Sequence, residues 1–257
     1  MSQFHWAFAV IAMTPLLNAC GGGGGGGGGG SGEQPPVQIP PTSPTPSPPP
    51  TPTPTPTPDP TLISNPFMDP AKWEIGPIVN GSNYSVGVPL RPFSHPEGWS
   101  IDLPQPSAEA GHVHYVTTPV NSLAGKTRIV IKYRIEADPG VKILPRTDPN
   151  LPSLLTLYFQ RSGDNWSGAG AYETYRWWAT FRTHVDLTPG EYEMTARLDE
   201  NWTAIMYSTA QSSPSQFDAA RMNASRVGFT LGGGDGYGHG IFATGPAKLI
   251  VTDFRIE

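Results

Sequence analysis

The sequence predicts an all-β domain over residues 63–257, an antiparallel two-sheet jelly-roll sandwich with one short helix. Two observations predict it: several segments alternate apolar and polar residues with a period of two, and only one segment has helical spacing. Beyond residue 60, proline and glycine reach the density of an ordinary loop-rich domain. A domain of this length can bury a sizeable core without disulfides.

The clearest predicted strand is 127–136, where Ile129, Ile131 and Tyr133 share one face and Lys132 lies on the other. The same alternation is found in 155–161, 173–182, 191–198 and 247–256. The last of these changes phase after Val251, which predicts a bulge near Thr252 and Asp253. Shorter candidate strands are 84–88, 99–103, 112–117, 202–207 and 226–231.

The predicted helix is 215–224, with Phe217, Ala220 and Ala224 on one side and Ser213 or Ser215 available as the N-cap. No internal repeat accompanies these elements. The pattern therefore favours one folded domain.

The first sixty residues predict a targeting segment followed by a linker. Residues 6–13 form an apolar run of the length found in signal peptides, too short to span a bilayer. Ten glycines follow Cys20, and fourteen prolines lie between Pro35 and Pro60. We expect 21–62 to be a disordered linker, flexible in its glycine tract and extended in its proline tract.

Leu17, Asn18, Ala19 and Cys20 resemble the lipobox of bacterial lipoproteins. This resemblance implies that residues 1–20 are a signal peptide ending at the cysteine and that the Cys20 thiol carries the lipid. It also implies a cell-envelope location, with the outer membrane favoured and the domain in the periplasm or at the cell surface. The lipid would then be the only membrane contact.

Charge excludes one class of partner. After residue 60 the chain has 16 basic and 19 acidic residues, a net charge of 16 − 19 = −3, and no basic run. Without a basic stripe to neutralise phosphates, nucleic-acid binding is not expected. We expect a monomer whose partner is a polysaccharide or oligosaccharide.

An aromatic cluster between Trp166 and Trp178 is the strongest functional pattern in the domain. If 173–182 is a strand, Trp177 and Trp178 point to opposite faces, one into the core and the other toward water. A tryptophan between Arg176 and Arg182 would offer a sugar ring a flat apolar surface edged by hydrogen-bond donors. The same face of 155–161 would add Tyr158 and Gln160.

Packing alone also accounts for this cluster. Trp178 is equally consistent with a ring under a loop or stacked on an arginine, and Trp166 with a lid on the sandwich. The turn-rich loop 163–168 favours exposure of Trp166, since loops carry many binding groups.

The glycine-rich segment 232–240 lacks the spacing of a phosphate-binding loop and is typical of a bulged hairpin. A second interpretation places Tyr237 and His239 at the rim of the ligand site, with Asp235 as a ligand of structural Ca²⁺. Asp253 is another candidate Ca²⁺ ligand. No cofactor is expected to be required.

Two further sites have weaker support. His112 and His114 share one strand face and would chelate a transition metal only if a third ligand joined them. Arg176, His184 and Tyr175 have the chemistry of a polysaccharide lyase without its motif. The candidate carboxylates for glycoside hydrolysis are Glu173, Glu191, Glu193, Asp199 and Glu200, and the solvated face of Glu191 and Glu193 favours ordinary surface residues there.

With this aromatic strand and glycine-rich loop, the domain resembles jelly-roll carbohydrate-binding modules of the concanavalin-like or galactose-binding-like type. The resemblance implies glycan recognition, often with structural Ca²⁺, and transfers no residue roles because no family motif is present. We therefore expect a lipid-anchored, non-catalytic carbohydrate-binding protein. The alternatives are a polysaccharide lyase or glycoside hydrolase in the same groove, and a structural or adhesive envelope protein without a groove.

Overall fold

The computed structural model describes residues 65–105, 112–233 and 237–257, all within one compact unit. The predicted signal peptide, Cys20, the linker and Asp235 lie outside these residues. In the described ranges no helix is long and apolar enough to cross a membrane.

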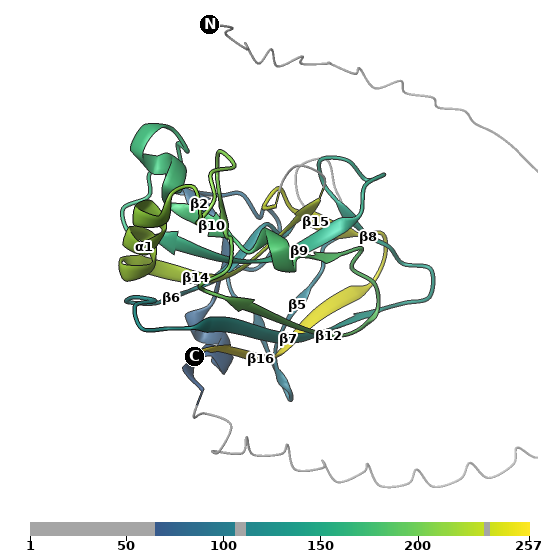
Figure 1. The fold of residues 1–257 in the computed structure, drawn as a ribbon. Helices are drawn as coiled ribbons and strands as arrows, with labels where there is room; N and C mark the ends of the chain where they lie inside the picture. The colour runs from purple at the N-terminus through teal and green to yellow at the C-terminus, as the bar shows by residue number, and fades with distance from the viewer. Residues whose placement is uncertain (1–64, 106–111, 234–236) are drawn as a thin grey trace, which may run out of the picture. The chain divides into compact units, whose positions relative to one another are not determined.

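Two antiparallel sheets form the sandwich that the sequence predicts (Figure 1). The seven-stranded sheet has the order β1-β6-β14-β9-β10-β13, with β11 also paired to β9. Its strands are β1 (Glu74–Gly76), β6 (Tyr115–Pro119), β9 (Ser153–Arg161), β10 (Arg176–Trp178), β11 (His184–Val185), β13 (Thr203–Ala204) and β14 (Ala224–Gly233).

The five-stranded sheet has the order β12-β7-β16-β5-β4. Its strands are β4 (Phe93–His95), β5 (Gly98–Asp102), β7 (Arg128–Ala137), β12 (Gly190–Arg197) and β16 (Ala247–Ile256). The register between β16 and β7 shifts between Val251 and Asp253, which confirms the predicted bulge.

Short elements close the ends of the sandwich. Two-stranded pairs join β2 (Ile78–Val79) to β3 (Ser82–Asn83) and β8 (Ile143–Pro145) to β15 (Ile241–Ala243). Single 3-10 turns are η2 (Pro66–Met68), η3 (Pro70–Lys72), η4 (Gly170–Thr174) and η5 (Thr180–Arg182).

The predicted helix forms as α1 (Pro214–Met222). Ser213 occupies the N-cap position, but its side chain makes no capping hydrogen bond. The helix buries Phe217, whose ring lies 4.9 Å from that of Trp177 and 5.8 Å from that of Phe159. This contact ties α1 to the core side of the seven-stranded sheet.

Large aromatic rings fill the space between the sheets. Trp73 and Trp99 lie 4.6 Å apart between ring centroids, and Phe254 meets Trp73 edge to face at 4.9 Å. At about 25 cal/mol per Å² of buried apolar surface, such rings contribute most of the folding free energy gained by burial.

The predicted strand 84–88 is wrong, and the predicted strands 173–182 and 202–207 are too long. Residues 84–88 form turns, and within 202–207 only β13 is a strand. Within 173–182 only Arg176–Trp178 pairs with β9, because the chain enters the 3-10 turns η4 and η5 on either side. The alternation of apolar and polar residues does not reveal such turns, because their backbone hydrogen bonds form within the segment and not with a neighbouring strand.

Candidate functional site

The candidate site lies on the face of the seven-stranded sheet that points away from the core. Register places Arg176 opposite Gln160, and Trp178 opposite Tyr158. On the next strand Gly228 is opposite Tyr158. In β9 both faces are buried, since residues 153–160 are all buried. Something therefore covers the outer face of this sheet.

Trp177 and Trp178 diverge as predicted, but the expectation that Trp178 faces water is wrong. Trp177 joins the core with no exposed surface, whereas Trp178 lies on the opposite face and is only 6% exposed. The Trp178 ring packs on Tyr158 at 5.3 Å, and its Nε1 donates to Thr230 Oγ1 at 3.1 Å. An enclosed indole cannot serve as a sugar platform.

The cover over Trp178 comes from three loops. Trp166, Ile205 and Tyr237 all pack on the outer cluster formed by Tyr115, Tyr158 and Trp178. Tyr237 is half-buried, with its ring 6.2 Å from Trp178. We call Trp166, Ile205 and Tyr237 the roof of this cluster. For Trp166 and Tyr237, this packing is the alternative that the sequence left open.

Asp164 holds the Trp166 loop in place. Its side chain is 1% exposed, and it accepts from Gln160 Nε2 at 2.9 Å and from the Trp166 backbone N–H at 3.0 Å. Arg176 Nε lies 2.9 Å from Asp164 Oδ2, although this N–H is not aligned as a hydrogen bond. The contact is therefore an ion pair, held where water does not screen it.

Arg176 also fixes the Trp166 ring. The guanidinium lies 4.8 Å from the ring centroid and donates from its terminal nitrogen to the Trp166 carbonyl at 3.1 Å. Tyr115 meets the Trp166 indole edge to face at 5.6 Å. Trp166 has a φ of +64°, a left-handed conformation that costs a non-glycine residue energy. These contacts maintain that conformation.

Beside the Trp166 ring lies a small pocket with a volume of about 110 Å³. Trp166, Tyr115, Gln160, Thr117, Arg226, Glu74, Pro77 and Ile78 line it. Arg226 Nε donates to Thr117 Oγ1 at 2.9 Å, and a terminal Arg226 nitrogen lies 2.9 Å from Glu74 Oε1. The pocket thus combines an aromatic edge with amide, hydroxyl, guanidinium and carboxylate groups.

Two tyrosine hydroxyls lie under this site. Tyr158 is fully buried, and its hydroxyl has no hydrogen-bond partner in the described part of the protein. Burial raises the pKa of Tyr158 well above its usual range and that of Tyr115 to about 12. Both hydroxyls therefore stay protonated near neutral pH and are able to donate hydrogen bonds.

The other predicted ligand contacts lie apart from the pocket. Arg182 is exposed on η5 and pairs with Glu200 at 3.2 Å, and His239 is exposed in its loop. Arg182 does not share the sheet face of Arg176, because the strand ends at Trp178. The expected row of Arg176, Trp178 and Arg182 is therefore wrong.

The described residues include no group of three or more potential metal ligands. Asp253 is engaged by an ion pair with Arg255 and by Asn65 Nδ2 at 3.5 Å. His112 and His114 lie 6.2 Å apart between ring centroids, and His114 Nδ1 bonds the Gly238 carbonyl at 3.0 Å. Each of these side chains thus has a structural partner.

The three residues considered for lyase chemistry do not converge. Arg176 is opposite Gln160 and His184 opposite Leu155, five positions away on β9, so the two side chains leave opposite faces of the sheet. His184 Nδ1 instead lies 2.5 Å from the Tyr133 hydroxyl. Tyr175 lies under the Arg161 guanidinium at 4.6 Å.

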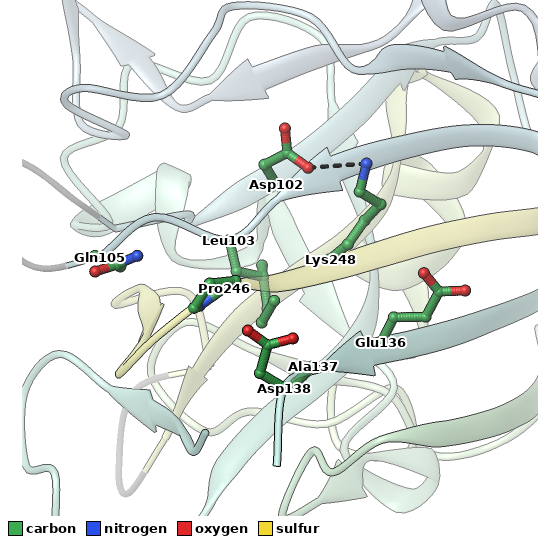
Figure 2. A pocket seen from close by; sticks show the side chains of 9 residues that line it. Asp102, Leu103, Gln105, Glu136, Ala137, Asp138, Pro246 and Lys248 are labelled. Carbon is green, nitrogen blue, oxygen red and sulfur yellow. Dashed lines mark ion pairs between the residues drawn. The ribbon is translucent and has the colours of Figure 1, made fainter. Parts of the chain in front are cut away.

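The five-stranded sheet carries two larger hollows. One, of about 430 Å³, is lined by Asp102, Glu136, Asp138 and Lys248, and Figure 2 shows its carboxylates and the 3.1 Å ion pair from Lys248 to Asp102. The other, of about 510 Å³, is lined by Tyr133 and Tyr192, whose rings stack at 5.0 Å, and by five charged side chains that include Glu191 and Glu193. The first hollow has no aromatic residue in its lining, and in the second Tyr133 is only 1% exposed. We therefore place the candidate site in the smaller pocket, where an indole meets polar groups.

Sequence reasoning identified Gln160 and Trp166 and missed Tyr115, Thr117, Arg226 and Glu74. Tyr115 and Thr117 were within a predicted strand and share the period of an outward face. Arg226 began another predicted strand. What the sequence did not provide was the order of the strands, which brings β1, β6, β14 and β9 side by side.

Comparisons with known proteins give little further information. No family model matches the sequence, and no curated protein matches it. Among solved structures, a xylan-binding module CBM15 matches with 12% identity and a TM-score of 0.34, over 71% of this chain and 92% of that one. A similarity this low carries no weight for the function proposed below.

Proposed function

We propose that the domain binds a carbohydrate, without catalysis, in the pocket beside Trp166. The observation that carries this proposal is the pairing of a rigidly held indole with Gln160, Arg226 and Glu74 in one hollow. Sugar rings present C–H faces that pack on aromatic rings and hydroxyls that both donate and accept hydrogen bonds. The wall of this pocket offers both kinds of partner.

The separation of Arg176 from His184 on opposite faces of the sheet supports a binding role over lyase chemistry. General acid and base catalysis needs both groups within hydrogen-bond reach of one substrate position. Of the lyase trio, only Arg176 lies on the side of the sheet that carries the pocket, and there it is paired with Asp164. We therefore place sugar recognition, and no bond cleavage, at this site.

A glycan array tests the proposal with residues 61–257 carrying Trp166→Ala. We expect the array signal to fall by tenfold or more, since losing a contact of about 1.4 kcal/mol lowers affinity tenfold. Phe93→Ala is the matched control, because Phe93 is an exposed aromatic residue on the other sheet. Circular dichroism establishes that both variants fold.

Two outcomes would contradict the proposal. If wild-type protein binds no envelope, plant or algal glycan, the structural or adhesive alternative is favoured. If Trp166→Ala and Phe93→Ala bind a detected glycan equally well, the site lies elsewhere.

We also propose that Cys20 is lipidated and that 21–62 tethers the domain to the outer membrane. The support is the sequence of the segment, Leu17, Asn18, Ala19 and Cys20 followed by the Gly- and Pro-rich tract. Mass spectrometry of the mature N-terminus after expression in a bacterial host tests this. Cys20→Ser should release the protein from the membrane fraction, and an unmodified N-terminus in the wild type would refute the anchor.

A further inference from the structure

From the geometry of this pocket we infer that it takes the terminal residue of a neutral glycan chain, and that Glu74 sets the preference for neutral over acidic sugars. This inference rests on the proposed function and narrows its ligand. It depends on the size of the pocket, on what surrounds it, and on its charge.

The pocket is too small for a run of sugars. Its volume of about 110 Å³ is well below the 300–1,000 Å³ of sites that enclose drug-sized ligands. A hollow of this size accommodates part of one ring and its hydroxyls. The number of rings it engages is therefore one.

The surroundings of the pocket prevent a polymer from lying along the sheet. On one side Trp166, Ile205 and Tyr237 roof the outer cluster, so that Trp178 and Tyr158 are not available as neighbouring subsites. At the β1 end of the sheet the chain enters the β2–β3 hairpin, where Pro77 and Ile78 form part of the wall. A glycan reaches the pocket end-on, with the rest of its chain in solvent.

The charges in the wall are neutralised in pairs. Arg226 lies 2.9 Å from Glu74, and Arg176 is paired with the buried Asp164. The Arg226–Glu74 pair still presents N–H donors and carboxylate oxygens, which suit adjacent hydroxyls. A uronic acid would have to bring its carboxylate close to that of Glu74, so an acidic terminal residue is disfavoured.

Replacing Glu74 by Gln should reverse this preference. The substitution keeps the size of the side chain, removes its negative charge and leaves the Arg226 charge unneutralised, so that it attracts the carboxylate of a uronic acid. Asp102→Asn is the matched control, since Asp102 is paired with Lys248 on the outer face of the five-stranded sheet. Both variants lose one carboxylate charge.

Isothermal titration calorimetry provides the test. The probes are gluco-, xylo-, manno- and galacto-oligosaccharides of one to six residues, and oligogalacturonates of the same lengths. For the neutral series that binds, we expect the Kd, expressed per chain end, to change by less than about threefold as the chain lengthens. A threefold change corresponds to a binding free energy difference under about 1 kcal/mol, because a tenfold change corresponds to about 1.4 kcal/mol. Glu74→Gln should shift the ratio of neutral to uronate affinity by about tenfold toward uronate, while Asp102→Asn leaves it unchanged.

The outcomes separate this inference from the proposed function. Affinity that rises steadily with each added sugar would retain carbohydrate binding and overturn recognition of the chain end. An unchanged neutral-to-uronate ratio in Glu74→Gln would overturn the role of Glu74. No heat with any probe would overturn the proposed function and this inference together.

Discussion

Removing the carboxylate of Asp164 should destabilise the domain far more than removing one from a surface ion pair. In Asp164→Ala the Arg176 charge would remain in an environment where its side chain is 10% exposed, with no anion beside it. Breaking a buried pair in this way typically costs about 3–5 kcal/mol of unfolding free energy. Gln160 and the Trp166 N–H would also lose their acceptor.

Asp199→Ala supplies the control for this prediction. Asp199 and Arg197 form a pair with N–O distances of 2.5 and 2.9 Å, but their side chains are 62% and 63% exposed. Solvent screens such a pair, so its loss should cost far less than the loss of the buried pair.

Urea denaturation followed by far-ultraviolet circular dichroism measures both variants, provided that their m-values match that of the wild type. If Asp164→Ala costs no more than Asp199→Ala, the argument that Asp164 is a buried anchor of the roof is refuted. The same variant should weaken glycan binding where it still folds, because Trp166 would no longer be held in place.

Two further predictions concern backbone spacing and pH. Gly228→Ala would push a Cβ into the Val116 carbonyl oxygen between β14 and β6, so we expect a loss of about 1–3 kcal/mol in urea denaturation, and an unchanged midpoint would contradict the close approach. Burial lowers the pKa of His114 from 6.5 to about 4, against the opposing bond to the Gly238 carbonyl. The unfolded chain therefore binds this proton first, and stability should fall by up to about 3 kcal/mol as pH drops from 6.5 to 4 and then level off. His114→Gln should flatten that slope, whereas exposed His239→Gln should not; equal slopes in the two variants would refute the assignment.

The sequence predicted long elements well because a period-two alternation sustained over many residues rarely arises outside a half-buried strand. The bounds of β16 and its bulge were predicted correctly, and β7 was predicted within one residue. Strands of three residues, such as β1 and β4, carry too few alternations to be detected.

The site was only partly predictable for a physical reason. Opposed side chains at 177 and 178 follow from the pleat of any strand, so their divergence was predictable. Whether the outward ring meets water depends on Trp166, Ile205 and Tyr237, which come from three separate loops. No local pattern around Trp178 contains that information.

The free-energy cost of holding the Trp166 loop in place supports the proposal that Trp166 contacts a ligand. A buried ion pair often contributes little net stability, because desolvation of both charges offsets their attraction. Asp164 and Arg176 are nevertheless buried together, and between them they hold Trp166 in a left-handed conformation that costs further energy. An apolar loop would cover Tyr158 and Trp178 without either cost. The Asp164–Arg176 pair also fixes the orientation of the Trp166 indole at the edge of a polar pocket. Ligand recognition requires such a fixed orientation, whereas folding does not.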